Sequence, residues 1–165
     1  MLRSLLMTCT IVAAAPALCA AQGDVRVEPS HLQGPRPLQE QTQAAAIRDY
    51  LQAWHTVSAA FDSNNASLLD REFVGTARDK LAEAIQQQSA LGIHTRYQDK
   101  SHDIQIVFYS PEGLSIQLTD EVQYDVQVLD HDKVQTTQQV RARYILVLTP
   151  AEVRWRVRVF QAQLE

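Results

Sequence analysis

The stretch 140–160 constrains the fold most, because two long segments of it alternate between apolar and polar residues. Apolar residues occupy every second position, and arginines fill many of the positions between them. Thr149-Pro150-Ala151-Glu152 separates the two segments and has the composition of a turn. A period of two is expected of strands with one buried face, so this stretch predicts two paired antiparallel strands.

The N-terminal residues resemble a targeting segment. The apolar run 5–18 is followed by Cys19-Ala20-Ala21, and small residues at this place are typical of signal-peptidase cleavage. We therefore expect 1–21 to be a signal peptide and the mature protein to be secreted or periplasmic. An uncleaved anchor is the alternative, but the run is shorter than the roughly 20 apolar residues of a spanning helix. Cys9 and Cys19 both lie here, so no disulfide is expected in the mature protein.

Helical periodicity follows a segment that predicts a linker. Residues 22–39 contain three prolines and two glycines with little apolar periodicity, which indicates a flexible linker. In 40–61 apolar side chains recur every three or four residues, which predicts a long helix with Trp54 on its apolar face. The same spacing in 66–91 predicts further helix, broken near Gly75 and capped by Asn65.

From residue 93 onward the period changes to two. The predicted strands are 93–97, 102–109, 114–129, 134–149 and 153–161. Helices first and strands second indicate an α+β fold, with the N-terminal helices packed on a curved antiparallel sheet. We expect 40–165 to form this one domain.

Two segments carry a resemblance to a known superfamily. Ile47-Arg48-Asp49-Tyr50-Leu51-Gln52-Ala53-Trp54 and the closing Val153-Arg154-Trp155-Arg156-Val157 resemble the nuclear transport factor 2-like superfamily, whose fold is an α+β cone. The resemblance covers 39–163 and implies the same cone. A narrower likeness is to the intermembrane-space domain of the chloroplast-division inner-envelope protein. Because this chain has a signal-like start and no preceding division-protein region, we do not expect from this resemblance a role in plastid division.

Histidines are the first residues to consider for catalysis. Enzymes of the resembled superfamily use a cavity His, Asp or Tyr for acid–base chemistry, and His55 is the candidate here. Its place beside the apolar stripe also fits a histidine at the helix boundary. His102 and Asp103 point to opposite faces of a strand, which argues against a dyad. No metal site and no cofactor motif is predicted.

Aromatic residues are expected beneath the first helix. The cavity-lining candidates are Trp54, Tyr97, Tyr124, Tyr144 and Trp155. They would either form a pocket for a small apolar ligand or fill a core in which each hydroxyl has a partner.

Arginines dominate the opposite face of the last two strands. The candidate interaction surface consists of Arg141, Arg143, Arg154, Arg156, Arg158 and Phe160. Such a face is either solvated and salt-bridged or an interface with a second copy or another protein.

Composition and motifs favour a binding module over an enzyme. The net charge of −4 argues against nucleic-acid binding. The first hypothesis is a secreted or periplasmic non-catalytic binding module that self-associates through its sheet face. The alternative is a small acid–base enzyme of the isomerase, dehydratase or hydrolase type with a conical apolar cavity.

Overall fold

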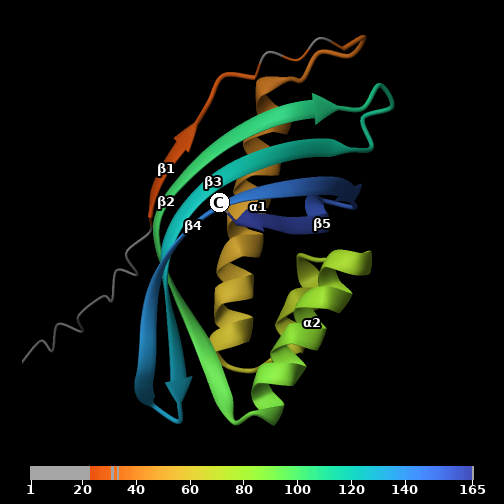
Figure 1. The fold of residues 1–165 in the computed structure, drawn as a ribbon. Coiled ribbons are helices and arrows are strands. Elements are labelled where there is room, and N and C mark those ends of the chain that lie inside the picture. The colour runs from red at the N-terminus through yellow and green to blue at the C-terminus, as the bar shows by residue number, and fades with distance from the viewer. Residues whose placement is uncertain (1–22, 31, 33, 165) are drawn as a thin grey trace, which may run out of the picture.

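The computed structural model describes residues 23–30, 32 and 34–164 (Figure 1). The expected signal peptide lies outside the described residues. The elements in chain order are β1 (Asp24–Val27), α1 (Glu40–Asp62), the 3₁₀ helix η1 (Ala66–Arg71), α2 (Gly75–Ala90), β2 (Ile93–Tyr109), β3 (Ile116–Asp130), β4 (Lys133–Ala151) and β5 (Arg154–Leu164). The predicted order of helices before strands holds for β2 to β5, whereas β1 precedes α1. The predicted break near Gly75 is confirmed, and the φ of Gly75 is +57°.

The five strands form one sheet in the order β1-β2-β3-β4-β5. β1 is parallel to β2, and the other neighbours are antiparallel. The sheet curves around α1, which crosses its concave side, while α2 lies beside α1 near one end (Figure 1). The predicted α+β architecture is confirmed. Within the described residues, no helix is long and apolar enough to cross a membrane.

The strand β1 lies inside the segment that the sequence predicted to be a flexible linker. It pairs with the edge of β2 from Ser101 to Ile104. Gly23 precedes it, and a Cβ added there would stand 3.1 Å from the main-chain carbon of Lys100. The short contact explains why a residue without a side chain fits where the segment joins the sheet. A short ordered strand thus lies in a segment whose proline and glycine content predicted a flexible linker.

The core lies between α1 and the concave face of the sheet. Tyr50, Trp54, Val57 and Phe61 form the buried stripe of α1, as the helical period predicted. The sheet contributes buried aliphatic residues at alternating positions, among them Ile104, Leu118, Val122, Leu146 and Leu148. The two predicted strands 93–97 and 102–109 form the single strand β2.

A β-bulge in β2 decides which side chains enter the core. Asp99 is opposite Tyr124 and Ser101 is opposite Gln123, so Lys100 is an extra residue on β2. A bulge of this kind bends the strand and shifts its alternation by one. Asp99 and His102 therefore both point to the concave side, although three positions separate them.

A second bulge, in β5, overturns one prediction. Val157 is opposite Leu148 and Val159 is opposite Val147, so Arg158 is the extra residue. After it the alternation is reversed, and Phe160 is opposite the fully buried Leu146. Phe160 therefore lies on the concave side, and its predicted place on the arginine face is wrong. A period of two cannot be extended through a one-residue bulge.

Candidate functional site

Trp54 is the centre of an aromatic cluster inside the cone. Its ring lies edge-on to the rings of His102, Tyr124 and Tyr144, at centroid distances of 5.3, 5.7 and 5.1 Å. Phe160 packs at 5.9 Å. These distances and angles are in the range that favours aromatic pairs. The cluster joins α1 to four strands of the sheet and fixes Trp54 among them.

The polar atoms of this cluster are bonded to one another. The indole N–H of Trp54 donates to Oδ1 of Asp99 at 2.7 Å. The hydroxyls of Tyr124 and Tyr144 are 3.0 Å apart and share a hydrogen bond. Such pairing offsets the cost of removing these groups from water. The arrangement holds the aromatic rings rigidly in place.

A small cavity remains next to the cluster. It has a volume of about 100 Å³ and is lined mainly by aromatic side chains: Trp54, Phe61, Tyr97, Tyr144 and Phe160. Pockets for drug-sized ligands usually measure about 300–1,000 Å³. The space therefore suits only a very small ligand.

Burial keeps the phenols of this region neutral. It is the main cause that raises the pKa of Tyr97, and it also raises the pKa of Tyr144, where the hydrogen bond to Tyr124 adds to the effect. At neutral pH these hydroxyls can donate hydrogen bonds but cannot serve as bases. A base inside the cone would have to be another group.

The most buried polar group is the carboxylate of Asp120 on β3. Its Oδ2 accepts hydrogen bonds from the hydroxyl of Tyr50 at 2.5 Å and lies 2.7 Å from Nδ1 of His102. Its Oδ1 accepts from the main-chain N–H of Asp103 at 3.0 Å. Tyr50 and Asp120 are fully buried, and His102 is almost so. We call these three residues the Asp120 network.

The Asp120 network orients groups without exposing them. Burial raises the pKa of Tyr50 well above its usual value, and the charge of Asp120 raises it further. His102 also borders a void of about 10 Å³. That volume is the size that holds one water molecule. The network can therefore fix the ring of His102 and reach a water, but a substrate has no room beside it.

Sequence reasoning missed Asp120, although one signal was present. Asp120 occupies a position of β3 whose neighbours two residues away, Leu118 and Val122, are fully buried. A carboxylate at an apolar position of a strand needs a buried partner. The partners, Tyr50 and His102, come from other elements and have no fixed spacing from it. His102 meets the side chain of Asp120, and Asp103 meets it through its main-chain N–H.

The other predicted site residues lie away from the cavity. His55 is exposed on α1 and touches only the rim of the 10 Å³ void. Trp155 is half-buried, and its main-chain N–H donates to Oδ2 of Asp49 at 2.8 Å. The structure thus brings together Trp54, Tyr97, Tyr124 and Tyr144 but leaves Trp155 and His55 outside the group.

The predicted arginine surface divides into two parts. Arg141 and Arg143 are exposed on the convex face, where Arg141 lies 3.4 Å from Glu121. Arg154 and Arg156 reach the segment around η1 instead. Nη1 of Arg154 donates to both carboxylate oxygens of Glu72, at 3.1 and 3.3 Å. Arg158, at the bulge, is exposed.

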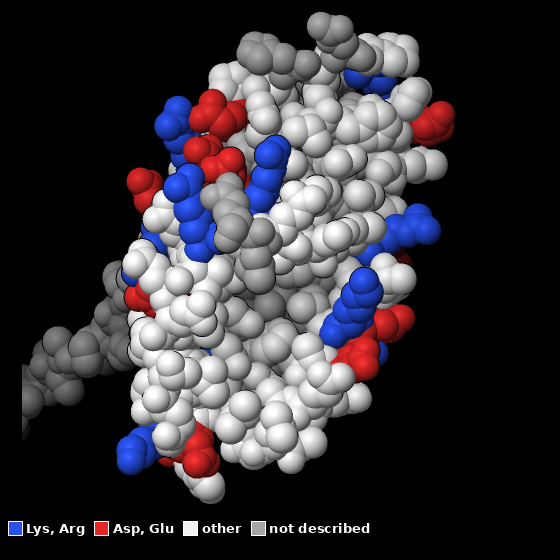
Figure 2. Space-filling view, viewed as in Figure 1, with Lys and Arg blue, Asp and Glu red and all other residues white. Residues whose placement is uncertain are grey.

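The surface has no field of a single sign in the view of Figure 2. Positive and negative side chains lie next to each other at the edges, and much of the centre is uncharged. Long-range attraction of a polyanion needs a continuous basic patch. The face seen in Figure 2 carries charges of both signs.

Comparisons with known proteins show likeness in structure. No family model matches the chain, and no curated protein matches it. The intermembrane space region of chloroplast protein ARC6 has a TM-score of 0.65 at 12% identity, covering 79% of this chain and 100% of that one. A scytalone dehydratase-like protein from Novosphingobium aromaticivorans has a TM-score of 0.57 at 14% identity, covering 77% and 89%.

A third solved structure, ActVI-ORFA from Streptomyces coelicolor, has a TM-score of 0.50 at 12% identity, covering 72% of this chain and 96% of that one. Identities this low show the fold alone. The likenesses confirm the cone-shaped fold that the sequence resemblance implied. Because the similar structures include both an enzyme-like protein and a region of a chloroplast protein, chains of different function share this fold.

Proposed function

From the nuclear transport factor 2-like fold of this chain and its filled interior, we propose that the protein is an exported, non-catalytic binding module that self-associates through its convex sheet face. The observation that carries the proposal is the interior. Trp54 and its aromatic neighbours occupy the space under α1, and the cavity beside them, in the part of the chain that the structure describes, measures about 100 Å³. An enzyme acting inside the cone would need room for a substrate beside its acid and base.

The polar groups of the interior support the same reading. Tyr50, His102 and the main-chain N–H of Asp103 all bind the Asp120 carboxylate. The indole of Trp54 binds Asp99. Groups that are already paired and buried rigidify a core and specify its packing. They are poorly placed to exchange protons with a bound molecule.

The convex face supplies the proposed contact. Ile145 and Val147 on β4 and Val159 on β5 are half-buried there, with no helix of the described residues over them (Figure 1). The register places Arg143 directly opposite Glu121 of β3. Opposite charges thus lie side by side around an apolar strip.

A second copy is the partner that fits this pattern best. A two-fold interface uses the same patch on both subunits, so a patch must be complementary to itself. On the convex face the arginines belong to β4 and the carboxylate of Glu121 to β3, and a two-fold rotation can bring one set against the other. The half-buried residues Ile145, Val147 and Val159 would form the apolar centre of the interface.

Light scattering of the mature protein tests the proposal. We expect a dimer, and we expect the double variant Arg143→Glu with Ile145→Asp to be a monomer with an unchanged circular dichroism spectrum. Like charges and a buried carboxylate would then oppose association. Lys80→Glu is the matched control, because Lys80 is exposed on α2, away from the convex face. It should leave the dimer intact.

A monomeric unmutated protein at high concentration would refute self-association. Dissociation of the Lys80→Glu control to the same extent would refute the convex face as the site. Export is tested separately, by mass spectrometry of the secreted or periplasmic fraction. A mature form that still contains Cys9 would contradict the proposed cleavage.

Acid–base catalysis is the second candidate function. The contact between Nδ1 of His102 and Oδ2 of Asp120, 2.7 Å, is the observation that favours it, because a carboxylate commonly orients a catalytic histidine. Room for a substrate would have to come from the aromatic cavity, which shares Trp54 with the void beside His102. A small apolar ligand such as phenol should then raise the melting temperature of the unmutated protein by entering that cavity. Tyr97→Trp should fill that cavity. If phenol raises the melting temperature of this variant as much as that of the unmutated protein, phenol does not bind in the aromatic cavity, and this candidate function is refuted.

A further inference from the structure

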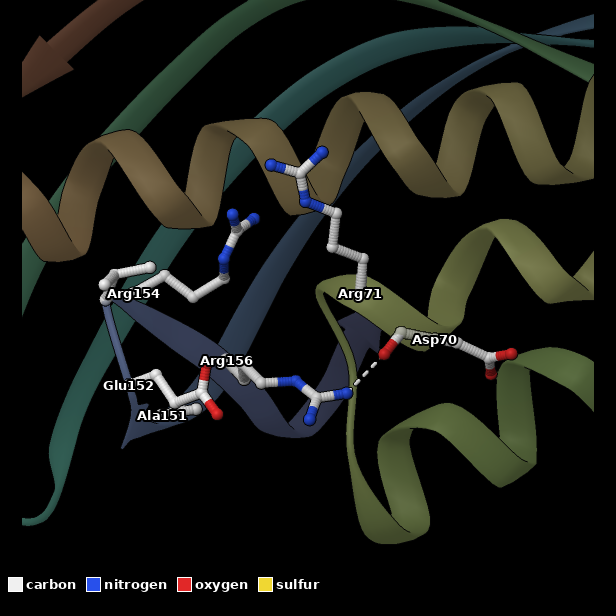
Figure 3. Close-up of a pocket in the computed structure, with 7 residues that line it drawn as sticks. Asp70, Arg71, Ala151, Glu152, Arg154 and Arg156 are labelled. Atoms are coloured by element: carbon white, nitrogen blue, oxygen red, sulfur yellow. Dashed lines mark hydrogen bonds between the residues drawn. The ribbon is translucent and has the colours of Figure 1, made fainter.

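A second concave region lies between η1 and the turn that joins β4 to β5, on the far side of β5 from the aromatic cavity. It has a volume of about 350 Å³, which is within the usual range for small-molecule sites. Three arginines line it: Arg71 from η1 and Arg154 and Arg156 from β5 (Figure 3). We call this region the arginine pocket. It shares no residue with the proposed dimer contact.

Arg156 is held by main-chain atoms. Its Nη2 donates to the carbonyl oxygens of Asp70 and Phe73, the latter at 2.8 Å. Its Nε is buried, and no hydrogen-bond partner for it occurs among the described residues. Carbonyls fix the guanidinium group but do not neutralise its charge. A cation that is already positioned loses little freedom when it binds an anion.

The nearby carboxylates are mostly committed to other cations. Glu72 is buried and accepts both of its bonds from Arg154. The carboxylate of Asp70 points away from the three arginines in Figure 3 and accepts from Nε of Arg78 at 2.9 Å. These two carboxylates therefore leave Arg71 and Arg156 available.

Arg71 is the most exposed of the three arginines. Its side chain is 72% exposed, and its approach to Glu72 is long, at 3.6 Å. Glu152 is the remaining acid of the pocket wall, and it belongs to the β4–β5 turn. With Arg78, which pairs with Asp70, four arginines stand against Asp70, Glu72 and Glu152, and this leaves one positive charge in and around the pocket. That surplus matches a monoanion better than a dianion.

The chemistry of the wall indicates what the rest of the ligand is. Ala151 and Val153 also line the pocket, and Val153 is 84% exposed. A guanidinium fork matches the two oxygens of a carboxylate in geometry. An apolar body next to the carboxylate would cover Val153. We propose that the arginine pocket binds a small organic carboxylate with an apolar body, through Arg71 and Arg156.

Benzoate is a suitable probe, with benzamide as its uncharged equivalent and phenyl phosphate as the dianion. Titrations of the mature protein would be followed by calorimetry and by the NMR signal of the Arg156 Nε–H group. We expect saturable benzoate binding that shifts this signal. Benzamide should bind about tenfold more weakly, because it lacks the charge-assisted hydrogen bonds. Phenyl phosphate should also bind more weakly than benzoate.

Variants then locate the site. Arg71→Gln should weaken benzoate binding about tenfold, and Glu152→Gln should strengthen it by removing the competing charge. Arg71 is exposed, so its loss should not unfold the protein. Arg158→Gln is the matched control: Arg158 lies on the same strand as Arg156, is exposed and does not line the pocket. It should leave the affinity unchanged.

Equal binding of benzoate and benzamide would overturn the proposal, and so would unchanged affinity in Arg71→Gln. Tighter binding of phenyl phosphate than of benzoate would overturn the assignment to a carboxylate. The effects of Arg71→Gln and Glu152→Gln do not depend on whether the protein dimerises, because Arg71 and Glu152 lie outside the proposed dimer contact.

Discussion

Carboxylates meet their partners differently in the two concave regions of the molecule. Inside the cone, Asp120 is surrounded by a tyrosine hydroxyl, an imidazole and a main-chain N–H, all within 3.0 Å. In the arginine pocket, Glu72 is paired with Arg154, while Arg156 is held by two carbonyls and keeps an uncompensated charge. The first arrangement uses up its polar groups in stabilising the fold, and the second leaves cationic groups for a ligand. A concave shape alone therefore does not indicate which of the two regions binds a ligand.

The comparison depends first on the aromatic interior being a packed core. Trp54→Ala should lower the free energy of unfolding by about 3–5 kcal/mol, because it removes a buried indole and leaves a cavity. Trp155→Ala is the control and should cost clearly less, since Trp155 is only half-buried. Urea unfolding measures both. A loss below about 1 kcal/mol for Trp54→Ala would show that the interior is not tightly packed.

The second prediction concerns the Asp120 network. Asp120→Asn should lower the free energy of unfolding by about 2–3 kcal/mol. The NH₂ group of the amide is a donor, and it would face groups of Tyr50, His102 and Asp103 that now bind carboxylate oxygens. Glu121→Gln, at the next residue but on the convex face, should change stability by less than about 0.5 kcal/mol. Thermal unfolding of both variants measures the difference. Equal effects would mean that the network adds no stability.

The third prediction compares two arginines. Arg154→Gln should lower the free energy of unfolding by about 2 kcal/mol, because it leaves the carboxylate of Glu72 buried without its partner. Arg141→Gln, which breaks an exposed pair with Glu121, should cost less than about 0.5 kcal/mol. Urea unfolding at neutral pH distinguishes them. A larger effect at Arg141 would reverse the assignment of structural and exposed arginines.

The smallest effect, counted per residue and per pH unit, is a pH dependence of the aromatic interior. Burial raises the folded-state pKa of Tyr97 and Tyr144 above the unfolded value of about 10. The resulting stability is complete below pH 10 and is lost as the pH rises toward the folded values. Each such tyrosine should lower the free energy of unfolding by about 1.4 kcal/mol per pH unit above 10.

Urea unfolding between about pH 9 and pH 11, within the alkaline range where tyrosine titrates, measures this slope. Tyr97→Phe should reduce this slope by the contribution of one tyrosine. A slope that is unchanged in Tyr97→Phe would show that this hydroxyl ionises in the folded protein as freely as in the unfolded chain.

Local periodicity predicted the elements well. The apolar stripe of α1, the placement of Trp54 on it and the cap at Asn65, whose side chain accepts from the N–H of Ser67, follow from residues close in sequence. The order of the elements then suggested how the helices cover the sheet. These features depend on spacing within one segment, which is visible in a single chain.

The candidate sites were harder to predict because they join distant segments. Asp120 and Tyr50 are 70 positions apart, and Arg154 and Glu72 are 82 apart. No spacing rule connects such pairs, although a carboxylate among apolar neighbours in β3 was a signal that a buried partner exists. Phe160 was misplaced for another reason, since an alternating pattern carries no mark of the bulge at Arg158.

That bulge has a consequence for how β5 tolerates change. The bulge absorbs Arg158 as an extra residue, so the residues on both sides of it keep consecutive partners on β4. Deleting Arg158 would remove the bulge and leave Val159 opposite Val147 and Phe160 opposite Leu146, so Phe160 would still face α1. In this strand the deletion of one arginine is therefore expected to straighten the ladder and to leave the aromatic core in place.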